Sequence, residues 1–148
     1  DKGMIDALYR ASEAGVKIDL IIRGICCLVP NQPYSRNIRV TRIVDAYLEH
    51  ARVWYFLSGG KETTYLTSAD WMARNLHRRI EVAFPVYAEP LKRQIIDILK
   101  IQLEDNQSAV WVDEQLNNVF KRELASPDEL PVRAQQAIYD YLKKSTGQ

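Results

Sequence analysis

The sequence predicts a mixed α/β fold in which helices and strands form layers. Apolar residues recur at helical spacing near both ends of the chain, short runs rich in β-branched and aromatic residues lie between them, and breaks containing glycine or proline separate the segments. Alternation of this kind is typical of sheets packed against helices. With 148 residues, 47% of them hydrophobic, the chain is long enough for a single domain, 1–148, with its own core.

The first third of the chain is expected to contain two helices and one strand. Residues 2–14 have apolar residues at helical spacing and end at Gly15, a common residue after a helix. Residues 16–22 are apolar and rich in branched side chains, which predicts a buried strand that ends before Arg23. After a proline-containing loop, apolar residues in 37–49 again recur at helical spacing. We therefore predict a second helix that carries His50 near its C-terminal end.

The middle of the chain is expected to form a β-hairpin. Residues 52–57 and 63–67 are rich in aromatic and β-branched side chains, and Ser58-Gly59-Gly60-Lys61 between them has the composition of a hairpin turn. Because a hairpin reverses the chain, it should bring Ser68 and Asp70 toward His50. Beyond it the sequence predicts a strand at 79–86, an amphipathic helix at 90–103, a short segment around Trp111 and a final helix at 131–144.

Charge is distributed unevenly, although the formal net charge is only +1. The segment from Arg23 to Arg79 contains eight arginines and one lysine against four acidic residues, which gives +5, and the rest of the chain is −4. Arginine binds phosphate oxygens with two parallel hydrogen bonds, so the segment could bind a polyanion. The alternative is a solvated arginine face with local carboxylate partners.

Other classes of protein are disfavoured by composition. No apolar run approaches the roughly 20 residues of a membrane-spanning helix, and the start of the chain lacks the architecture of a signal peptide. The only cysteines, Cys26 and Cys27, are adjacent, which suits neither a redox pair nor a zinc site. We expect a reduced, partly buried pair in a cytosolic protein.

A candidate phosphate site begins at Glu49-His50-Ala51-Arg52 and continues at 67–75. A histidine can donate a hydrogen bond or act as a general acid near neutral pH, and phosphoryl transfer depends mainly on positioning and on stabilising charge. Arg23, after a strand, lies where α/β sheets commonly bind ligands. We expect Ser68 and Asp70 to orient the imidazole or a phosphate, and a cationic wall to be completed by Arg52, Arg74 and Arg79.

These residues also have ordinary structural interpretations. His50 could cap a helix or lie on the surface, and Arg52 could form an ion pair with Glu49. His77 is expected to be a surface or packing residue. The aromatic residues of the hairpin could stack on a base, but such residues more often belong to a core.

Several strings in the sequence resemble one family. Ser68-Ala69-Asp70-Trp71-Met72 followed by Arg74-Asn75 is the most specific, and it is joined by Ile22-Arg23-Gly24-Ile25-Cys26, Asn37-Ile38-Arg39, Tyr47-Leu48-Glu49-His50, Arg78-Arg79-Ile80-Glu81-Val82 and Pro85. These strings look like the C-terminal catalytic domain of bacterial polyphosphate kinases. The resemblance covers most of residues 3–105 and is expected to fade beyond Asp113, so that 113–148 would be a variable tail with a final helix.

The resemblance implies a phospholipase-D-like fold with a central sheet flanked by helices. It also implies reversible transfer of the terminal phosphate of ATP, through a phosphohistidine, to inorganic polyphosphate. His50 matches the family's second essential histidine, beside the nucleotide phosphates, and Arg23 matches the arginine that contacts ATP. The phosphorylated histidine and the ligands of Mg²⁺ are expected in preceding domains, so no metal site is predicted here. The fragment alone should be inactive.

Partners and location follow from the same resemblance. It implies ATP, ADP and polyphosphate as ligands, the preceding domains as packing partners and a homo-oligomer of the full-length enzyme, which would be cytoplasmic with peripheral membrane association. Nucleic acid is not expected as a ligand.

Two other functions stay open at this stage. A phospholipase-D-type phosphodiesterase is disfavoured because Arg52 and Leu57 occupy the positions of that pattern's lysine and aspartate. A non-enzymatic polyanion-binding module would bind with steep salt dependence and without need of His50.

Overall fold

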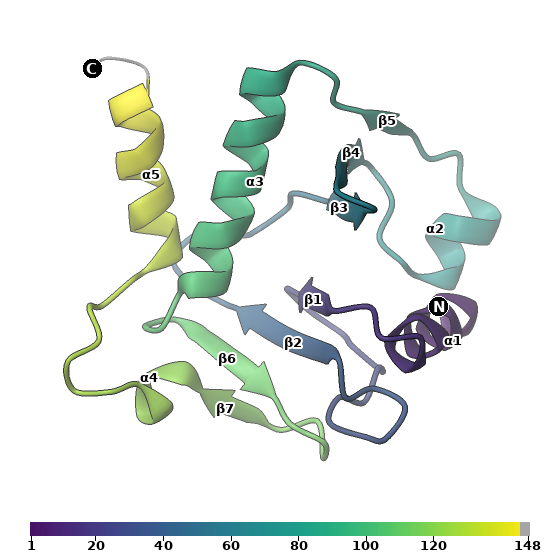
Figure 1. Ribbon diagram of the computed structural model, residues 1–148, viewed down its shortest axis with the longest axis horizontal. Helices are drawn as coiled ribbons and strands as arrows, with labels where there is room; N and C mark the ends of the chain where they lie inside the picture. Colours follow the sequence, from purple (N-terminus) through teal and green to yellow (C-terminus); the bar gives the residue numbers. More distant parts are fainter. Residues whose placement is uncertain (146–148) are drawn as a thin grey trace. The chain divides into compact units, whose positions relative to one another are not determined.

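The computed structural model describes residues 1–145 of the chain (Figure 1). The chain divides into two compact units. Unit 1 comprises Asp1–Met4 and His50–Ile98, and unit 2 comprises Ile5–Glu49 and Leu99–Gln148. Helices α1 (Lys2–Glu13) and α3 (Glu89–Glu104) each contribute residues to both units.

Unit 2 is built on a four-stranded sheet with the order β1-β2-β6-β7. Strand β1 (Ile18–Ile21) runs parallel to β2 (Ile38–Ile43), and β2 is antiparallel to β6 (Ala109–Val112). Strand β7 (Asn118–Phe120) closes the sheet antiparallel to β6. A short helix, α4 (Lys121–Leu124), follows β7 directly.

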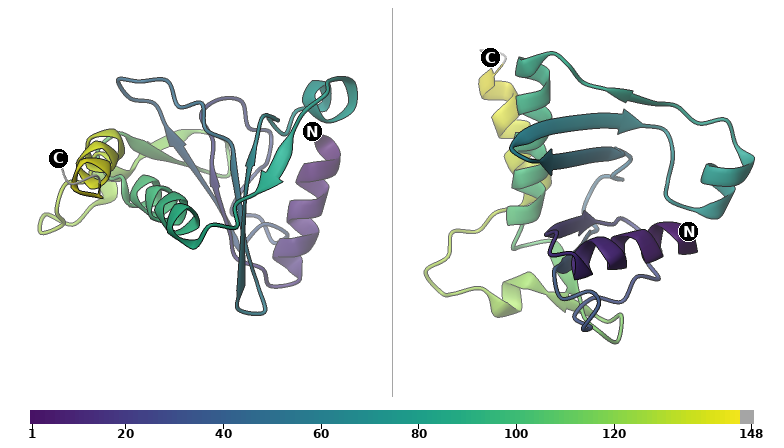
Figure 2. Two further views of the ribbon diagram at one scale, coloured as in Figure 1. Left: turned by 90° about the horizontal axis from the view of Figure 1, so that it is seen from above. Right: turned by 45° about the vertical axis from the view of Figure 1, so that its right-hand side comes forward.

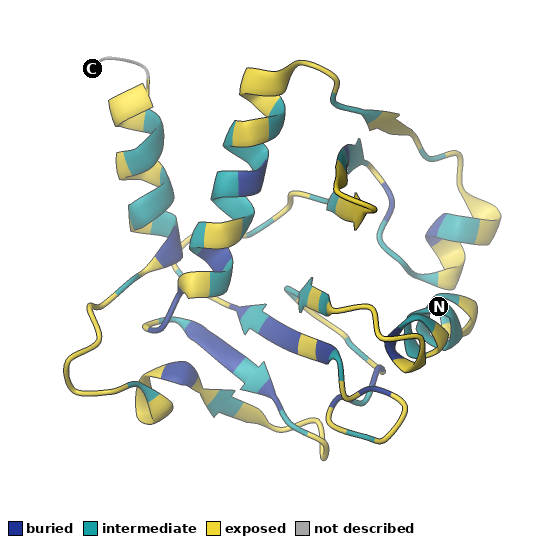
Figure 3. Ribbon diagram, in the orientation of Figure 1, coloured by how far each residue is buried: buried dark blue, intermediate teal, exposed yellow. Residues whose placement is uncertain are grey.

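Both faces of this sheet are covered by helices of unit 2, and its central strands are the most buried part (Figure 3). Side chains alternate between the faces of a strand, so Ile38 and Val40 lie on one face and Ile43 on the other. The first face forms a core with Leu28 and Val112, packed against α1 residues Ile5 and Leu8. The second face packs Ile43 with Ala109, Ala134, Ile101 of α3 and Ile138 of α5 (Ala134–Ser145).

Unit 1 contains a three-stranded antiparallel sheet of β3 (Val53–Ser58), β4 (Lys61–Thr67) and β5 (Ala83–Pro85). The β3–β4 hairpin is seen from the side in Figure 2. Its two-residue turn has φ of +55° at Gly59 and +83° at Gly60, a conformation that glycine adopts without steric cost. Between β4 and β5 lies the short helix α2 (Ala73–Arg78).

Most predicted elements are confirmed, including the mixed α/β class, the helix at 2–14, the hairpin and the helices near 90–103 and 131–144. The predicted helix at 37–49 is wrong. Residues 38–43 form β2, and the chain from 44 to 52 is irregular. Four of the six residues of β2, Ile-Arg-Val-Thr-Arg-Ile, are β-branched, and such residues favour a strand, although the apolar residues that follow fall at helical spacing.

Other elements are shorter than predicted. The strand at 16–22 is confirmed only for β1, and none of its residues is fully buried: Asp19 is exposed and the other three are half-buried. The strand at 79–86 is reduced to β5, since Ile80 is fully exposed and Val82 mostly exposed. The strands also belong to two sheets, one in each unit. Cys26 and Cys27 are free thiols, the first half-buried and the second exposed.

The irregular segment before His50 is held in place by the start of α5. The Asp45 carboxylate accepts hydrogen bonds from Ser108 Oγ at 3.0 Å and from Arg133 Nε at 2.8 Å, and Arg133 Nη2 also donates to it. The side-chain amide of Gln135 donates to the Tyr47 carbonyl and to the Glu49 carboxylate and accepts from the Tyr47 N–H. A conformation without regular backbone pairing is thus fixed by side chains.

We expect the contact between Asp45 and Arg133 to make unit 2 sensitive to acid. Hydrogen bonding to Arg133 lowers the pKa of Asp45 from 3.8 to about 2. A carboxyl whose pKa is lower in the folded state contributes stability that is complete above its unfolded pKa and is lost as the pH falls through the folded value. The free energy of unfolding should therefore fall between pH 4 and pH 2.

Urea unfolding across that pH window tests this expectation, with Arg133→Gln as the comparison. The variant should lose less stability on acidification than the wild type, because its Asp45 lacks the partner that lowers the pKa. Equal losses in the two proteins would contradict the assignment.

Candidate phosphate-binding site

The first part of the candidate site is an ion pair at the start and end of the hairpin in unit 1. Arg52 precedes β3 and Asp70 follows β4, and the hairpin brings them together, with the Thr67 N–H bonded to the Arg52 carbonyl at 3.0 Å. Arg52 Nε donates to Asp70 Oδ1 at 2.9 Å, and Arg52 Nη2 lies 3.3 Å from Asp70 Oδ2. The Asp70 carboxylate raises the pKa of the Arg52 guanidinium. Arg52 is therefore a fixed cation.

The third nitrogen of this guanidinium reaches His50. Arg52 Nη1 lies 3.3 Å from His50 Nδ1 and 3.4 Å from the His50 carbonyl oxygen. His50 itself is exposed, whereas Arg52 and Asp70 are partly buried. Asp70, Arg52 and His50 thus form a chain of contacts that runs from two partly buried side chains to an exposed imidazole.

A second cluster in unit 1 surrounds the Glu81 carboxylate. Ser68 Oγ donates to Glu81 Oε2, and Asn75 Nδ2 donates to Glu81 Oε1 at 2.7 Å. Ser68 Oγ also accepts from the Val82 N–H at 3.0 Å. The hydrogen bond from Ser68, that from Asn75 and the nearby charges of Arg79 and Arg52 all lower the pKa of Glu81, so this group is an anion among cations.

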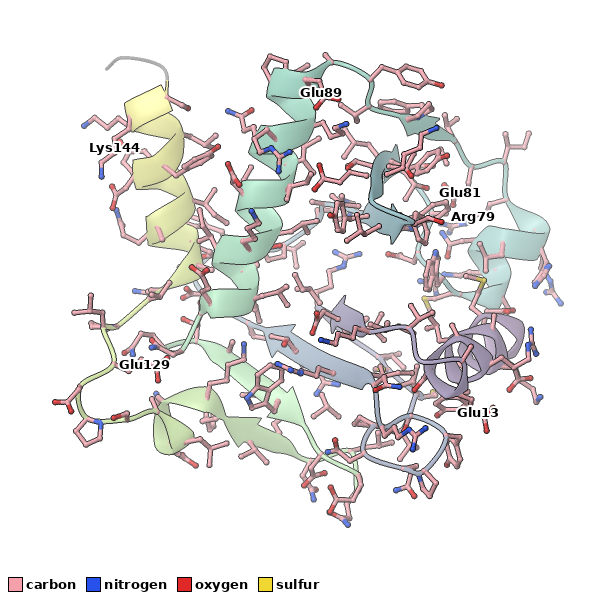
Figure 4. The ribbon with its side chains drawn as sticks, viewed as in Figure 1. Glu13, Arg79, Glu81, Glu89, Glu129 and Lys144 are labelled. Atoms are coloured by element: carbon pink, nitrogen blue, oxygen red, sulfur yellow. The ribbon has the colours of Figure 1, made fainter. Side chains whose placement is uncertain are left out.

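The other two arginines of the candidate site in unit 1 lie on α2 and directly after it. Arg74 is in the first turn of the helix, and Arg79 follows its last residue; both are exposed. Arg79 and Glu81 are labelled in Figure 4, and the charge of Arg79 acts on the Glu81 carboxylate. Arg79 therefore belongs to the second cluster, whereas Arg74 is placed only on the same helix as Asn75.

Arg23 belongs to unit 2, two residues after the end of β1. Its Nη1 donates to the Glu49 carbonyl oxygen at 3.2 Å. It also lines a hollow of about 270 Å³ together with Ile43, Val44, Asp45, Tyr47, Leu48 and Glu49. Arg23 thus contacts the backbone of the residue that precedes His50 in the chain.

Sequence reasoning anticipated part of this arrangement. The hairpin was predicted to bring Ser68 and Asp70 toward His50. Asp70 contacts Arg52, and it is Arg52 that contacts the imidazole, whereas Ser68 binds Glu81. The suggested partner of Arg52, Glu49, instead accepts hydrogen bonds from Gln135 and, at 3.5 Å, from Gln102. Glu81 was missed, although a single acidic residue within Arg78-Arg79-Ile80-Glu81 was a signal that could have found it.

The chemistry of these side chains is that of an anion-binding surface. Guanidinium, imidazole and hydroxyl groups donate hydrogen bonds to phosphate oxygens, and several are already fixed by neighbouring side chains. Within residues 1–145 there is no group of three or more histidine, cysteine, aspartate and glutamate side chains that could hold a metal ion. The fold and these groups define a candidate phosphate-binding protein of the α/β class.

Comparison with known proteins identifies the family. Residues 1–135 match the family model described as polyphosphate kinase C-terminal domain 2. The polyphosphate kinase of Yersinia pestis is 51% identical over 144 residues, and that of Escherichia coli (strain K12) is 48% identical over 144 residues; each alignment covers 97% of this chain. The crystal structure of polyphosphate kinase from Porphyromonas gingivalis is 63% identical, with a TM-score of 0.94 over 98% of this chain.

This chain therefore belongs to the polyphosphate kinase C-terminal domain 2 family, and it has the expected phospholipase-D-like fold of that enzyme. The match extends to residue 135, beyond Asp113. The chain spans 20% of the length of the Yersinia and Escherichia relatives and 22% of the Porphyromonas chain. Among the described residues, no helix combines the length and the apolar character needed to cross a membrane.

Proposed function

We propose that this chain is the part of a polyphosphate kinase that binds the phosphates of ATP and polyphosphate. The whole enzyme would transfer the terminal phosphate of ATP reversibly, through a phosphohistidine, to inorganic polyphosphate. The observation that carries the proposal is the family match over residues 1–135. It is supported by the fixed cation Arg52 between Asp70 and His50, in a segment whose arginines outnumber its acids.

The proposed ligand contacts are given for each unit by itself. Arg23 would bind phosphate oxygens beside the hollow next to β2, and His50 would donate a hydrogen bond to the transferring group. Ser68 would position Glu81, and Asp70 would position Arg52. Positive charge around the phosphates would be supplied by Arg52, Arg74 and Arg79.

The chemical contribution of such groups is positioning and charge stabilisation. In phosphoryl transfer, negative charge is spread over the oxygens of the transferring group, and prearranged donors stabilise it. The phosphorylated histidine and the ligands of Mg²⁺ would be supplied by other parts of the polypeptide, and the chain alone would have no turnover.

The same assignment implies packing partners, an oligomeric state and a cellular location for the whole enzyme. As a domain of a longer polypeptide, this chain would pack against preceding domains, and the whole enzyme would form a homo-oligomer. It would act in the cytoplasm, where ATP and ADP are available, with peripheral association with the membrane.

A second candidate function is a non-enzymatic polyanion-binding surface. It is favoured by one observation, the +5 charge of the segment from Arg23 to Arg79. Such a surface would bind any polyphosphate through its summed charge, with affinity that falls steeply with salt.

A tryptophan-fluorescence titration distinguishes the two candidates. Polyphosphate of defined length and ATP are added to the wild type, Arg23→Ala and His50→Ala at two salt concentrations. Loss of one charge-assisted hydrogen bond costs about 1.5–3 kcal/mol, so each variant should bind roughly tenfold more weakly or worse at both salt concentrations. The matched control is Arg93→Ala, which removes an exposed arginine of unit 1 that pairs with Glu62.

Saturable binding that both variants weaken, and that Arg93→Ala leaves nearly unchanged, is the expected result. If salt abolishes binding, His50→Ala leaves it unchanged and Arg23→Ala weakens it no more than Arg93→Ala does, the generic polyanion surface is the correct function and the kinase assignment of these residues fails.

A further inference from the structure

We infer that Asp70, acting through Arg52, holds the imidazole of His50 in the neutral tautomer that carries its proton on Nε2. The tautomer is inferred from contacts within unit 1 alone. Its consequence for phosphate binding rests on the proposed function. Asp70 and Arg52 are then positioning residues.

The first step is the fixation of Arg52. Two of its nitrogens, Nε and Nη2, are directed at the two carboxylate oxygens of Asp70, at 2.9 and 3.3 Å. A guanidinium is planar, so two contacts to one carboxylate fix the orientation of the whole group. The side chains of Arg52 and Asp70 are 19% and 27% exposed, which limits competition from water. The direction of the remaining Nη1 nitrogen is thereby set.

The second step is the assignment of the ring proton. Arg52 Nη1 lies 3.3 Å from His50 Nδ1 and 3.4 Å from the carbonyl of the same residue. A guanidinium has five N–H donors and no acceptor. A hydrogen bond between the two groups therefore requires a lone pair on Nδ1, and in a neutral imidazole the proton is then on Nε2.

The third step is the chemical consequence. A nitrogen that carries a proton in a neutral ring has no free lone pair, so Nε2 of His50 can donate a hydrogen bond but cannot attack phosphorus. His50 would thus donate to a phosphate oxygen and leave nucleophilic attack to another group. The hydrogen bond that Arg52 donates to Nδ1 thus explains why His50 would be a hydrogen-bond donor and not the nucleophile.

The experiment is an NMR measurement of the ring nitrogens in the ¹⁵N-labelled chain, at a pH high enough for both imidazoles to be neutral. Long-range ¹H–¹⁵N correlations distinguish a protonated ring nitrogen from one with a lone pair. The chain has two histidines, and His77→Gln assigns their signals. The variants are Arg52→Met and Asp70→Ala, and Arg93→Met is the matched control because it breaks a different arginine–carboxylate pair in unit 1.

In the wild type and in Arg93→Met we expect a single His50 tautomer with the proton on Nε2. In Arg52→Met and Asp70→Ala we expect a mixture of tautomers in fast exchange. A proton on Nδ1 in the wild type would overturn the inference, and so would a tautomer ratio that neither Arg52→Met nor Asp70→Ala changes. Should one variant fail to fold, the wild-type spectrum and the other variant still decide.

Addition of inorganic tripolyphosphate separates this inference from the proposed function. If both are correct, tripolyphosphate shifts the His50 Nε2 signal and leaves Nδ1 unprotonated. A fixed Nε2–H tautomer that does not respond to tripolyphosphate would support the positioning by Arg52 and overturn the proposed phosphate contact of His50.

Discussion

Replacing Asp105 with alanine is expected to destabilise the protein by at least about 3 kcal/mol. Asp105 lies at the end of α3 and is fully buried. Its Oδ1 accepts hydrogen bonds from the backbone N–H groups of Gln107, Ser108 and Ala109 at 2.7–2.9 Å, and its Oδ2 accepts from the N–H of Ala134 at 2.7 Å. Alanine would leave these donors without a partner, and a buried unsatisfied donor costs about 1–3 kcal/mol.

The effect should exceed that of an ordinary loop substitution, because this one carboxylate joins three elements of unit 2. It ends α3, begins β6 and supports the first residue of α5. Urea unfolding followed by circular dichroism measures the loss. Asp140→Ala is the control, since Asp140 is exposed on α5 and should change stability by less than about 0.5 kcal/mol. Equal effects of the two substitutions would contradict this account of Asp105.

The second large effect is expected for Leu28→Ala. Leu28 is only 2% exposed and packs with Ile38, Val40 and Val112 in the core under α1. Removing most of a buried leucine leaves a cavity, and the cost is typically about 2–5 kcal/mol. We expect about 3 kcal/mol in urea unfolding, with little change in the spectrum of the folded protein.

Leu130→Ala controls for this second prediction. Leu130 is 80% exposed, so the same chemical change should be nearly neutral there. If Leu28→Ala lowered the free energy of unfolding no more than Leu130→Ala does, the buried core beneath α1 would not stabilise the protein as this account requires.

The fold could be predicted from sequence wherever one signal dominated. The hairpin was predictable because Gly59 and Gly60 supply the turn and flanking aromatic and β-branched residues supply the strands. The structure of segment 37–49 could not be predicted in this way, because a strand pattern and a helical periodicity overlap in it. Ile43, Val44, Tyr47 and Leu48 match a helix, yet the last three are 72–80% exposed. Burial of Ile38, Val40 and Ile43 by the sheet decided the outcome.

The candidate site was predictable as a set of residues more than as a set of contacts. Local spacing predicted that the hairpin brings Asp70 toward His50, but not that Asp70 would reach the imidazole by way of Arg52. Local spacing could not show that Glu49 would bind Gln135, because that contact depends on how the distant start of α5 meets the irregular segment. Glu81 was missed for a related reason: its partners Ser68 and Asn75 meet it only through the path of the chain around α2.

The division of the chain into units also bears on the order in which the protein can fold during synthesis on the ribosome. Every residue of unit 1 has been made once Ile98 has been added, whereas unit 2 still lacks half of its sheet. Strand β2 must wait for its partner β6, which begins only at Ala109, and Asp105 must wait for Ala134. Domains generally fold as units during translation, so the hairpin unit can form first, while the apolar side chains of β2 remain uncovered until the C-terminal segments emerge.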